Sequence, residues 1–312
     1  MKIGQFKKNG EKKLIVIDNN NVYENSFEQN PNTNELIKSI KFENLSKLIK
    51  ELIKSNKLIK ISENEDFLYK NNYLMLKPVE PSEAWAAGVT YKRQAIEHDK
   101  DLKKKGRNDD LYYYVYKNDR VEIFFKGTSR TLVGSGENLW LRSDSKLIMP
   151  EAELVLVIGP TGLPVAYTLG NDLTAWDIES ECPLYLSQAK IWQGSGSIGP
   201  WMIPVENINS PYSFKINCTV KRNDDIVLNS TGNTSNLKRS IEELCYYMNL
   251  SNKVLPGTVL FTGTACIIDH NFSLKDGDIL EISNPEIGIL NNKISLHSKE
   301  EKNYSLREEE KL

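Results

Sequence analysis

The chain has 312 residues, of which 39% are hydrophobic and 26% charged, as in a soluble globular protein of one large or two modest domains. Its formal net charge of −2 excludes a general attraction to nucleic acid or to an anionic membrane. No apolar run approaches the roughly 20 residues of a membrane-spanning helix, and the N-terminal residues lack the apolar segment of a signal peptide. We therefore expect a cytoplasmic protein that binds neither nucleic acid nor membrane.

Residues 1–78 are rich in Lys and Asn and predict a small α/β accessory domain. Leu14–Asp18 is typical of a strand. Residues 42–53 predict an amphipathic helix, because apolar side chains recur there at helical spacing. The apolar stripe consists of Leu45, Leu48, Ile49, Leu52 and Ile53.

Residues 79–298 predict the main domain, and residues 299–312 form a charged tail. The polar stretch 98–110 is either a solvated helix or loop or a mobile lid. Leu237–Met248 predicts one helix, but most of the domain reads as strands separated by turns, which favours an α+β, mainly β class. The expected strands are 121–126, 137–142, 154–158, 165–170, 214–220, 259–264 and 278–282.

Two glutamates, Glu151 and Glu153, precede the apolar run 154–158. Alternate residues of a strand point to the same face, so the two carboxylates are predicted to lie side by side next to a buried segment. Their repulsion requires a proton or a cation, and Mg²⁺ prefers oxygen ligands of this kind. Four cysteines without a C-x-x-C pair and only three histidines make a zinc site a poor alternative.

Asp172 and Lys190 extend this pattern along the chain. A hairpin between Glu153 and Asp172 would return the third carboxylate to the first two, although all three could instead be surface groups on a strand edge. Lys190 has apolar or neutral neighbours and is a candidate general base beside a metal; an ion pair with a ligand carboxylate is equally compatible with the sequence.

Two further segments are more ambiguous. Glu122 is the one charged residue of the run 121–125, and a glutamate in a strand more often faces solvent. The run Gly194–Gly199 matches G-x-G-x-x-G, but Pro200 follows it rather than a helix, so a dinucleotide site is rejected. A glycine-rich turn next to a pocket is expected there.

Several short motifs in a fixed order resemble the fumarylacetoacetate hydrolase family over about residues 80–295. They are Gly88-Val-Thr-Tyr91, Phe124-Phe-Lys126, Pro150-Glu-Ala-Glu153, Gly170-Asn-Asp172, Gln188-Ala-Lys190, Gly199-Pro200, Pro256-Gly-Thr258 and Thr262-Gly-Thr264. The resemblance implies a mixed β-sandwich roll with a small N-terminal domain, assembled as a homo-oligomer, either dimer or tetramer.

The resemblance also implies a site. Glu151, Glu153 and Asp172 would hold Mg²⁺, with Mn²⁺ as an alternative, and Lys190 and Glu122 would act at the reacting carbons of a 2-keto acid. The substrate would be bound by Thr264, by the backbone of Val89, Thr90 and Tyr91, and by Gln188.

One departure from the family pattern distinguishes hydrolysis from elimination. Hydrolytic members carry a histidine three residues after the motif tyrosine, but here Gln94 follows Tyr91 at that spacing, and an amide cannot take a proton from water. Elimination is therefore favoured: dehydration of a 2-keto-3-deoxy sugar acid, namely 2-keto-3-deoxy-arabinonate to 2,5-dioxopentanoate in pentose catabolism. The alternatives are an acylpyruvate-type C–C hydrolase, with His98 replacing the missing histidine, a 2-oxoacid decarboxylase, and a non-catalytic keto-acid binding protein.

Overall fold

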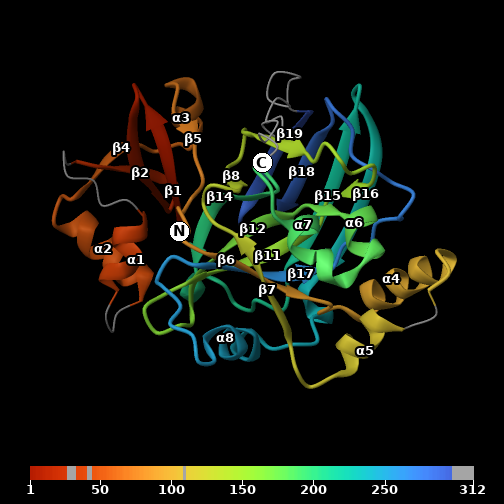
Figure 1. Ribbon diagram of the computed structural model, residues 1–312. Helices are drawn as coiled ribbons and strands as arrows, with labels where there is room; N and C mark the ends of the chain where they lie inside the picture. Colours follow the sequence, from red (N-terminus) through yellow and green to blue (C-terminus); the bar gives the residue numbers. More distant parts are fainter. Residues whose placement is uncertain (27–32, 41–43, 108–109, 297–312) are drawn as a thin grey trace, which may run out of the picture.

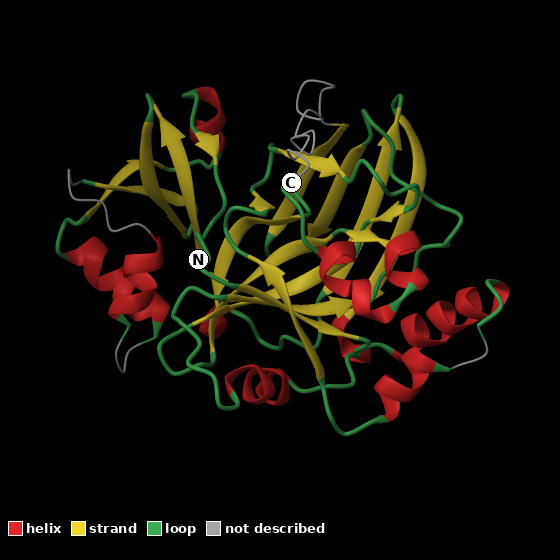
Figure 2. Ribbon diagram, viewed as in Figure 1, coloured by secondary structure: helices red, strands yellow, loops and turns green. Residues whose placement is uncertain are grey.

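A computed structural model describes residues 1–26, 33–40, 44–107 and 110–296. The charged tail 299–312 lies outside the described residues. Two large sheets face each other, and helices cover their edges and outer faces (Figures 1 and 2). The mainly β prediction is therefore confirmed. None of the described helices is long and apolar enough to cross a membrane.

The N-terminal part is a small sheet with three helices packed beside it. Its strands are β1 Lys2–Lys8, β2 Glu11–Asp18, β3 Asn21–Asn25, β4 Leu58–Ser62 and β5 Leu74–Met75, and its helices are α1 Thr33–Ser39, α2 Leu45–Lys54 and α3 Asp66–Lys70. Asn44 caps α2 through a hydrogen bond from Lys47 N, and the predicted stripe of α2 packs into the core. Strand β1 pairs with β14 of the main sheet at Ile3 and Met202, so this part extends that sheet.

The main sheet joins strands from distant parts of the chain. Its order from the N-terminal part is β4-β3-β2-β1-β14-β12-β11-β17-β6-β7, with β5 and β8 attached at the side. The new strands are β6 Ala84–Gly88, β7 Glu122–Gly127, β8 Leu132–Val133, β11 Ala152–Ile158, β12 Pro164–Asp172, β14 Gly196–Pro204 and β17 Val259–Thr264.

The second sheet runs β16-β15-β18-β19-β9 and packs over one face of the first. Its strands are β9 Asn138–Leu141, β15 Lys215–Arg222, β16 Asp225–Asn233, β18 Ile279–Asn284 and β19 Gly288–Leu296; a short pair, β10 Ile148–Met149 and β13 Thr174–Ala175, lies apart. The remaining helices are α4 Lys92–Lys104, α5 Leu111–Lys117, α6 Trp176–Glu181, α7 Leu186–Lys190 and α8 Ile241–Asn249.

Strand β11 shows why the sequence folds this way. It is buried along its whole length, and its side chains alternate between two apolar clusters. Leu154 and Leu156 join the cluster between the two sheets, whereas Val155 and Val157 join the cluster covered by α1 and α2. Glu153 shares the odd-numbered face with Val155, so the alternation carries its carboxylate to one end of that second cluster.

Two predictions about individual elements need correction. The glycine-rich run is a turn only at its start, where Gly194 has a φ of +65° and the Ser195 N–H donates to the Trp192 carbonyl; from Gly196 it forms β14, a fully buried strand between β12 and β1. A side chain at Gly196 would collide with Leu132 and the Asn171 carbonyl, so glycine here permits close strand packing. The helix expected from Leu237 begins instead at Ile241, because the Ser240 hydroxyl caps it by accepting from Glu243 N.

Candidate active site

The hairpin β11–β12 brings the three predicted carboxylates together. Glu153 pairs with Gly170 and Ala152 with Asn171, and the Asp172 N–H donates to the Glu151 carbonyl at 2.9 Å. One oxygen of each of Glu151, Glu153 and Asp172 lies within 4.8 Å of the other two. Glu153 and Asp172 are only 2% and 1% exposed. The predicted convergence is therefore present, and the strand-edge alternative is wrong.

The electrostatics of this cluster call for a cation. Burial and the charges of Asp172 and Glu151 raise the pKa of Glu153 well above its usual value, and burial also raises the pKa of Glu151. Burial acts in the same direction on Asp172, but Lys126 and Lys190 outweigh it and lower the pKa of that carboxyl. Three inward-facing carboxylates fit a hard divalent cation, which prefers oxygen ligands.

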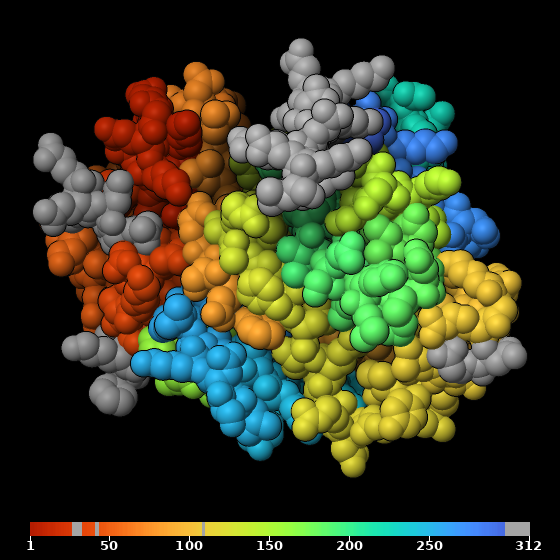
Figure 3. Space-filling view, in the orientation of Figure 1, coloured from red at the N-terminus to blue at the C-terminus, as the bar shows by residue number. Residues whose placement is uncertain are grey.

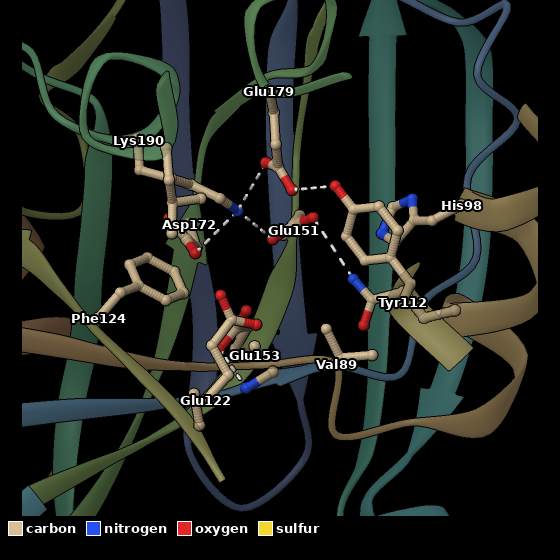
Figure 4. A pocket seen from close by; sticks show the side chains of 15 residues that line it. Val89, His98, Tyr112, Glu122, Phe124, Glu151, Glu153, Asp172, Glu179 and Lys190 are labelled. Atoms are coloured by element: carbon tan, nitrogen blue, oxygen red, sulfur yellow. Dashed lines mark hydrogen bonds and ion pairs between the residues drawn. The ribbon is translucent and has the colours of Figure 1, made fainter. Parts of the chain in front are cut away.

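Lys190, at the end of α7, points into this cluster (Figure 4). Its Nζ donates to Thr174 Oγ1 at 2.6 Å, to Glu151 Oε2 at 2.9 Å and to Asp172 Oδ2 at 3.2 Å. Burial disfavours the ammonium, but the charges of Asp172 and Glu151 prevail and raise the pKa of Lys190 well above its ordinary value. The ion pair left open by the sequence is thus present, while the role of Lys190 as a base stays a prediction.

Glu122 faces the pocket rather than solvent. It opens β7 and pairs with Gly88 of β6, and its carboxylate occupies the space that a Gly88 side chain would fill. Burial raises the pKa of Glu122, with the charges of Glu151 and Asp172 acting in the same direction. Figure 4 shows it beside Glu153, across the pocket from Lys190.

Only some of the predicted substrate-binding residues line the pocket. Val89 lines the pocket with a backbone φ of +56°, a left-handed conformation that is rare for a β-branched residue. The hydroxyls of Thr90 and Thr264 are committed to backbone carbonyls, donating to Thr262 O at 2.7 Å and Ala152 O at 2.9 Å. Thr264 lines a small adjacent cavity that also reaches Glu151. Tyr91 lines a separate outer groove.

Gln188 does not line the pocket. It is exposed, because it lies on the opposite face of α7 from Leu186 and Lys190, which are four residues apart and both line the pocket.

The chain resembles known proteins over most of its length. Residues 84–295 match the model of the fumarylacetoacetate (FAA) hydrolase C-terminal domain. The chain belongs to the fumarylacetoacetate hydrolase family. The motif-based assignment to this family, over nearly the same residues, is confirmed.

Several of the relatives that the chain resembles are sugar-acid dehydratases. The chain is 37% identical over 220 residues, 70% of its length, to 2-dehydro-3-deoxy-D-arabinonate dehydratase of Saccharolobus solfataricus, covering 74% of that protein. A probable 2-keto-3-deoxyxylonate dehydratase of Haloferax volcanii matches with the same identity and coverage. A solved structure of 2-keto-3-deoxy-D-arabinonate dehydratase complexed with magnesium and 2,5-dioxopentanoate has a TM-score of 0.78 and 29% identity, covering 96% of this chain and 100% of that one.

Sequence reasoning missed two ionisable residues of this fumarylacetoacetate hydrolase family site. Glu179 on α6 accepts a hydrogen bond from the Tyr112 hydroxyl at 2.8 Å, and burial raises its pKa to about 7. Glu179 was missed because the sequence of α6, Trp176–Glu181, looks like that of an ordinary exposed helix. Fully buried Lys126 pairs with Asp172 Oδ1 at 2.6 Å and donates to the Lys190 carbonyl. Its place in the Phe124-Phe-Lys126 motif was the available signal.

Proposed function

We propose that this chain is a Mg²⁺-dependent dehydratase that converts 2-keto-3-deoxy-arabinonate to 2,5-dioxopentanoate. The observation that carries the proposal is the convergence of three carboxylates around the buried Lys190 amine. The dehydratase relatives, one of them solved with magnesium and 2,5-dioxopentanoate, support the same reaction.

Glu151, Glu153 and Asp172 would hold the cation, and the same oxygen set would accept Mn²⁺. When bound, the divalent cation supplies Lewis-acid polarisation of the substrate's keto-acid end. Lys126, fully buried behind Asp172, holds that carboxylate in position. Val89 and the neighbouring backbone would contact the substrate in the same pocket.

Lys190 and Glu122 would divide the proton transfers. In our assignment Lys190 removes a proton from C3, and Glu122 protonates the C4 hydroxyl as it leaves, so that a C–H and a C–O bond break and one water is released. The charges of Asp172 and Glu151 raise the pKa of Lys190 in the metal-free protein, and a bound cation would offset them and favour the free amine that a base needs. Removal of a C5 proton with protonation of C3 then gives an enol, and loss of its O5 proton with protonation of C4 gives the C5 aldehyde. The raised pKa of Glu122 favours the protonated form that a proton donor needs.

Gly88 is expected to be required for the position of Glu122. In Gly88→Ala, the new methyl group would overlap with the Glu122 carboxylate, which would have to rotate out of the pocket. We expect kcat to fall by about 10²-fold, the low end for loss of an acid–base group, with Mg²⁺ affinity retained. Steady-state kinetics and calorimetry measure both quantities; unchanged kcat would contradict the placement of Glu122.

Mg²⁺ binding is expected to weaken as the pH falls, because burial raises the pKa values of Glu151 and Glu153 and protons compete for the same oxygens. Because the pKa values of Glu151 and Glu153 are higher in the folded than in the unfolded protein, the metal-free fold is more stable at low pH, where both are protonated. This stability is lost as the pH rises through the folded-state pKa values. Mg²⁺ should therefore raise the melting temperature more at higher pH. Calorimetry in two buffers of different ionisation enthalpy should reveal proton release; pH-independent affinity without proton release would contradict this.

The hydrolytic alternative lacks a base at the expected position. Gln94 lines the pocket, and its Nε2 donates to Glu151 Oε1 at 3.4 Å, but its amide cannot accept a proton from water. His98 lines the same pocket, and it is the group through which hydrolysis would have to proceed. Its Nδ1 is already hydrogen-bonded to His270 Nε2 at 2.9 Å.

Incubation with candidate substrates separates these functions. We expect NMR to show Mg²⁺-dependent conversion of 2-keto-3-deoxy-arabinonate to 2,5-dioxopentanoate, abolished by a chelator, with no cleavage of acylpyruvates. Cleavage of acylpyruvates would favour the hydrolase, and CO₂ release from 2-oxoacids the decarboxylase. Keto-acid binding without any turnover would favour the non-catalytic protein.

The proposal also covers the location, assembly and domain organisation of the enzyme. We place it in the cytoplasm as a homo-oligomer, dimer or tetramer, with residues 1–78 as an accessory domain and 79–298 as the catalytic one. All four cysteines are free, as expected in a reducing compartment. Light scattering of the purified protein would determine the assembly, and a monomer would contradict it.

A further inference from the structure

Glu179 has a carboxylate oxygen in the pocket that no described residue hydrogen-bonds. Glu179 is only 9% exposed, and its Oε1 accepts from the Tyr112 hydroxyl at 2.8 Å. Its Oε2 is buried and lacks a hydrogen bond among the described residues; the Lys190 Nζ lies 3.9 Å away. A buried carboxylate oxygen without a donor costs free energy, so the pocket is arranged for a donor that the protein itself does not supply.

Glu179 is held firmly in this orientation. Tyr112 lies in the first turn of α5, and its backbone N–H donates to the Asp99 carboxylate at 3.0 Å. The centre of the Tyr112 ring lies 4.8 Å from the centre of the His98 ring. On the other side, Lys105 Nζ donates to Ser180 Oγ at 2.9 Å and ties α4 to α6. Figure 3 shows the side chains of α6 and α7, in green, packed against those of α4 and α5, in gold.

The position of Glu179 matches the far end of a substrate. The Lys190 amine contacts two of the metal-binding carboxylates on one side and approaches Glu179 on the other (Figure 4). A keto acid whose carboxylate end lies at Glu151 and Asp172 and whose carbon chain passes Lys190 therefore directs its other end at Glu179. An ionised carboxylate only accepts hydrogen bonds, and a hydroxyl is the donor that a sugar acid carries there.

We infer that Glu179 accepts a hydrogen bond from the terminal hydroxyl of the substrate and so selects hydroxylated 2-keto acids over apolar ones. The inference rests on the proposed dehydratase function. A site built to bond a hydroxyl rejects analogues that lack it, because its polar group is then left buried and unpaired. Glu179 thereby disfavours the apolar chain of an acylpyruvate without contacting the reacting carbons.

Two keto acids of equal chain length test this inference. In 5-hydroxy-2-oxopentanoate and 2-oxopentanoate, C4 carries no hydroxyl, so neither can be dehydrated, and they differ only in the terminal hydroxyl. With saturating Mg²⁺ and at an alkaline pH, well above the pKa of about 7 of Glu179, calorimetry should show that wild type binds the hydroxylated acid roughly tenfold to hundredfold more tightly. In Glu179→Met the two affinities should be equal.

The ratio of the two affinities within one protein cancels any effect of a substitution on the metal site. Glu179→Gln keeps the shape and an acceptor for Tyr112 but loses the charge, so we expect a preference of only a few-fold. Glu181→Gln, an exposed change on the same helix, should keep the full preference. Equal affinities in wild type, or an unchanged ratio in both Glu179 variants, would overturn the inference.

The two hypotheses fail separately. Dehydration of the sugar acid together with equal affinities for the two analogues would refute the role of Glu179 alone. A hydroxyl preference that depends on Glu179 in a protein without dehydratase activity would refute the proposed function alone.

Discussion

Lys190→Ala is expected to lower kcat for sugar-acid dehydration by about 10²- to 10⁴-fold, the usual contribution of a general base. The substitution removes an amine that donates to one oxygen of Glu151 and one oxygen of Asp172, and it leaves all three carboxylates in place. It also removes a positive charge that competes with the metal. Calorimetry should therefore show Mg²⁺ affinity that is retained.

Lys253→Ala is the matched control, because this lysine is exposed and does not line the pocket. It should leave both kcat and metal affinity unchanged. If Lys190→Ala kept near-normal kcat, the base would have to be another group, and Glu122 would be the first to test. Loss of Mg²⁺ binding in this variant would instead show that Lys190 is needed to hold Glu151 and Asp172 in position for the metal.

Glu153→Gln is expected to weaken Mg²⁺ binding by more than the roughly 10- to 100-fold that the loss of an outer partner of a metal ligand costs. It replaces a buried carboxylate with a neutral amide of the same shape. The Gly263 N–H, which donates to Glu153 Oε2 at 2.7 Å, can still hold the amide oxygen, so the side chain should stay in place. Activity should fall in parallel and recover in part at high Mg²⁺ concentration.

Glu181→Gln provides the control for charge, since it removes one carboxylate from an exposed position. Thermal unfolding separates a metal defect from a folding defect. Because burial raises the pKa of Glu153, the neutral amide should not destabilise the metal-free protein, but a higher Mg²⁺ concentration should be needed for the same rise in melting temperature. Unchanged Mg²⁺ affinity would remove Glu153 from the ligand set.

The centre of the site could be predicted because its information is local. Alternation along a strand places Glu151 and Glu153 together, and one hairpin returns Asp172 to them, so three candidate ligands follow from about 20 consecutive residues. Lys190 was identified by the unusual apolar surroundings of a charged residue. Strand β11 could be predicted from the continuous apolar run 154–158, and β12 from the strand-like segment 165–170 that follows the turn after it.

The outer wall of the pocket could not be predicted in this way. Glu179 and Tyr112 are 67 positions apart and meet only because α5 packs against α6. Glu122 looks like a solvent-facing strand residue until β6 places Gly88 opposite it. Strand β14 was missed because it is buried on both faces and so shows no alternation of apolar and polar residues, and because its Gly and Pro residues resemble a turn. Each of these depends on tertiary packing rather than on local pattern.

A crystal structure of the protein soaked with Mg²⁺ and 2-oxobutyrate tests the central claim most directly. We predict one cation bound by Glu151, Glu153 and Asp172, with the keto-acid oxygens completing its coordination and the Lys190 amine within hydrogen-bond reach of the carbon next to the ketone. A cation held elsewhere, or a keto acid whose reactive carbon lies beyond the reach of Lys190, would contradict the account.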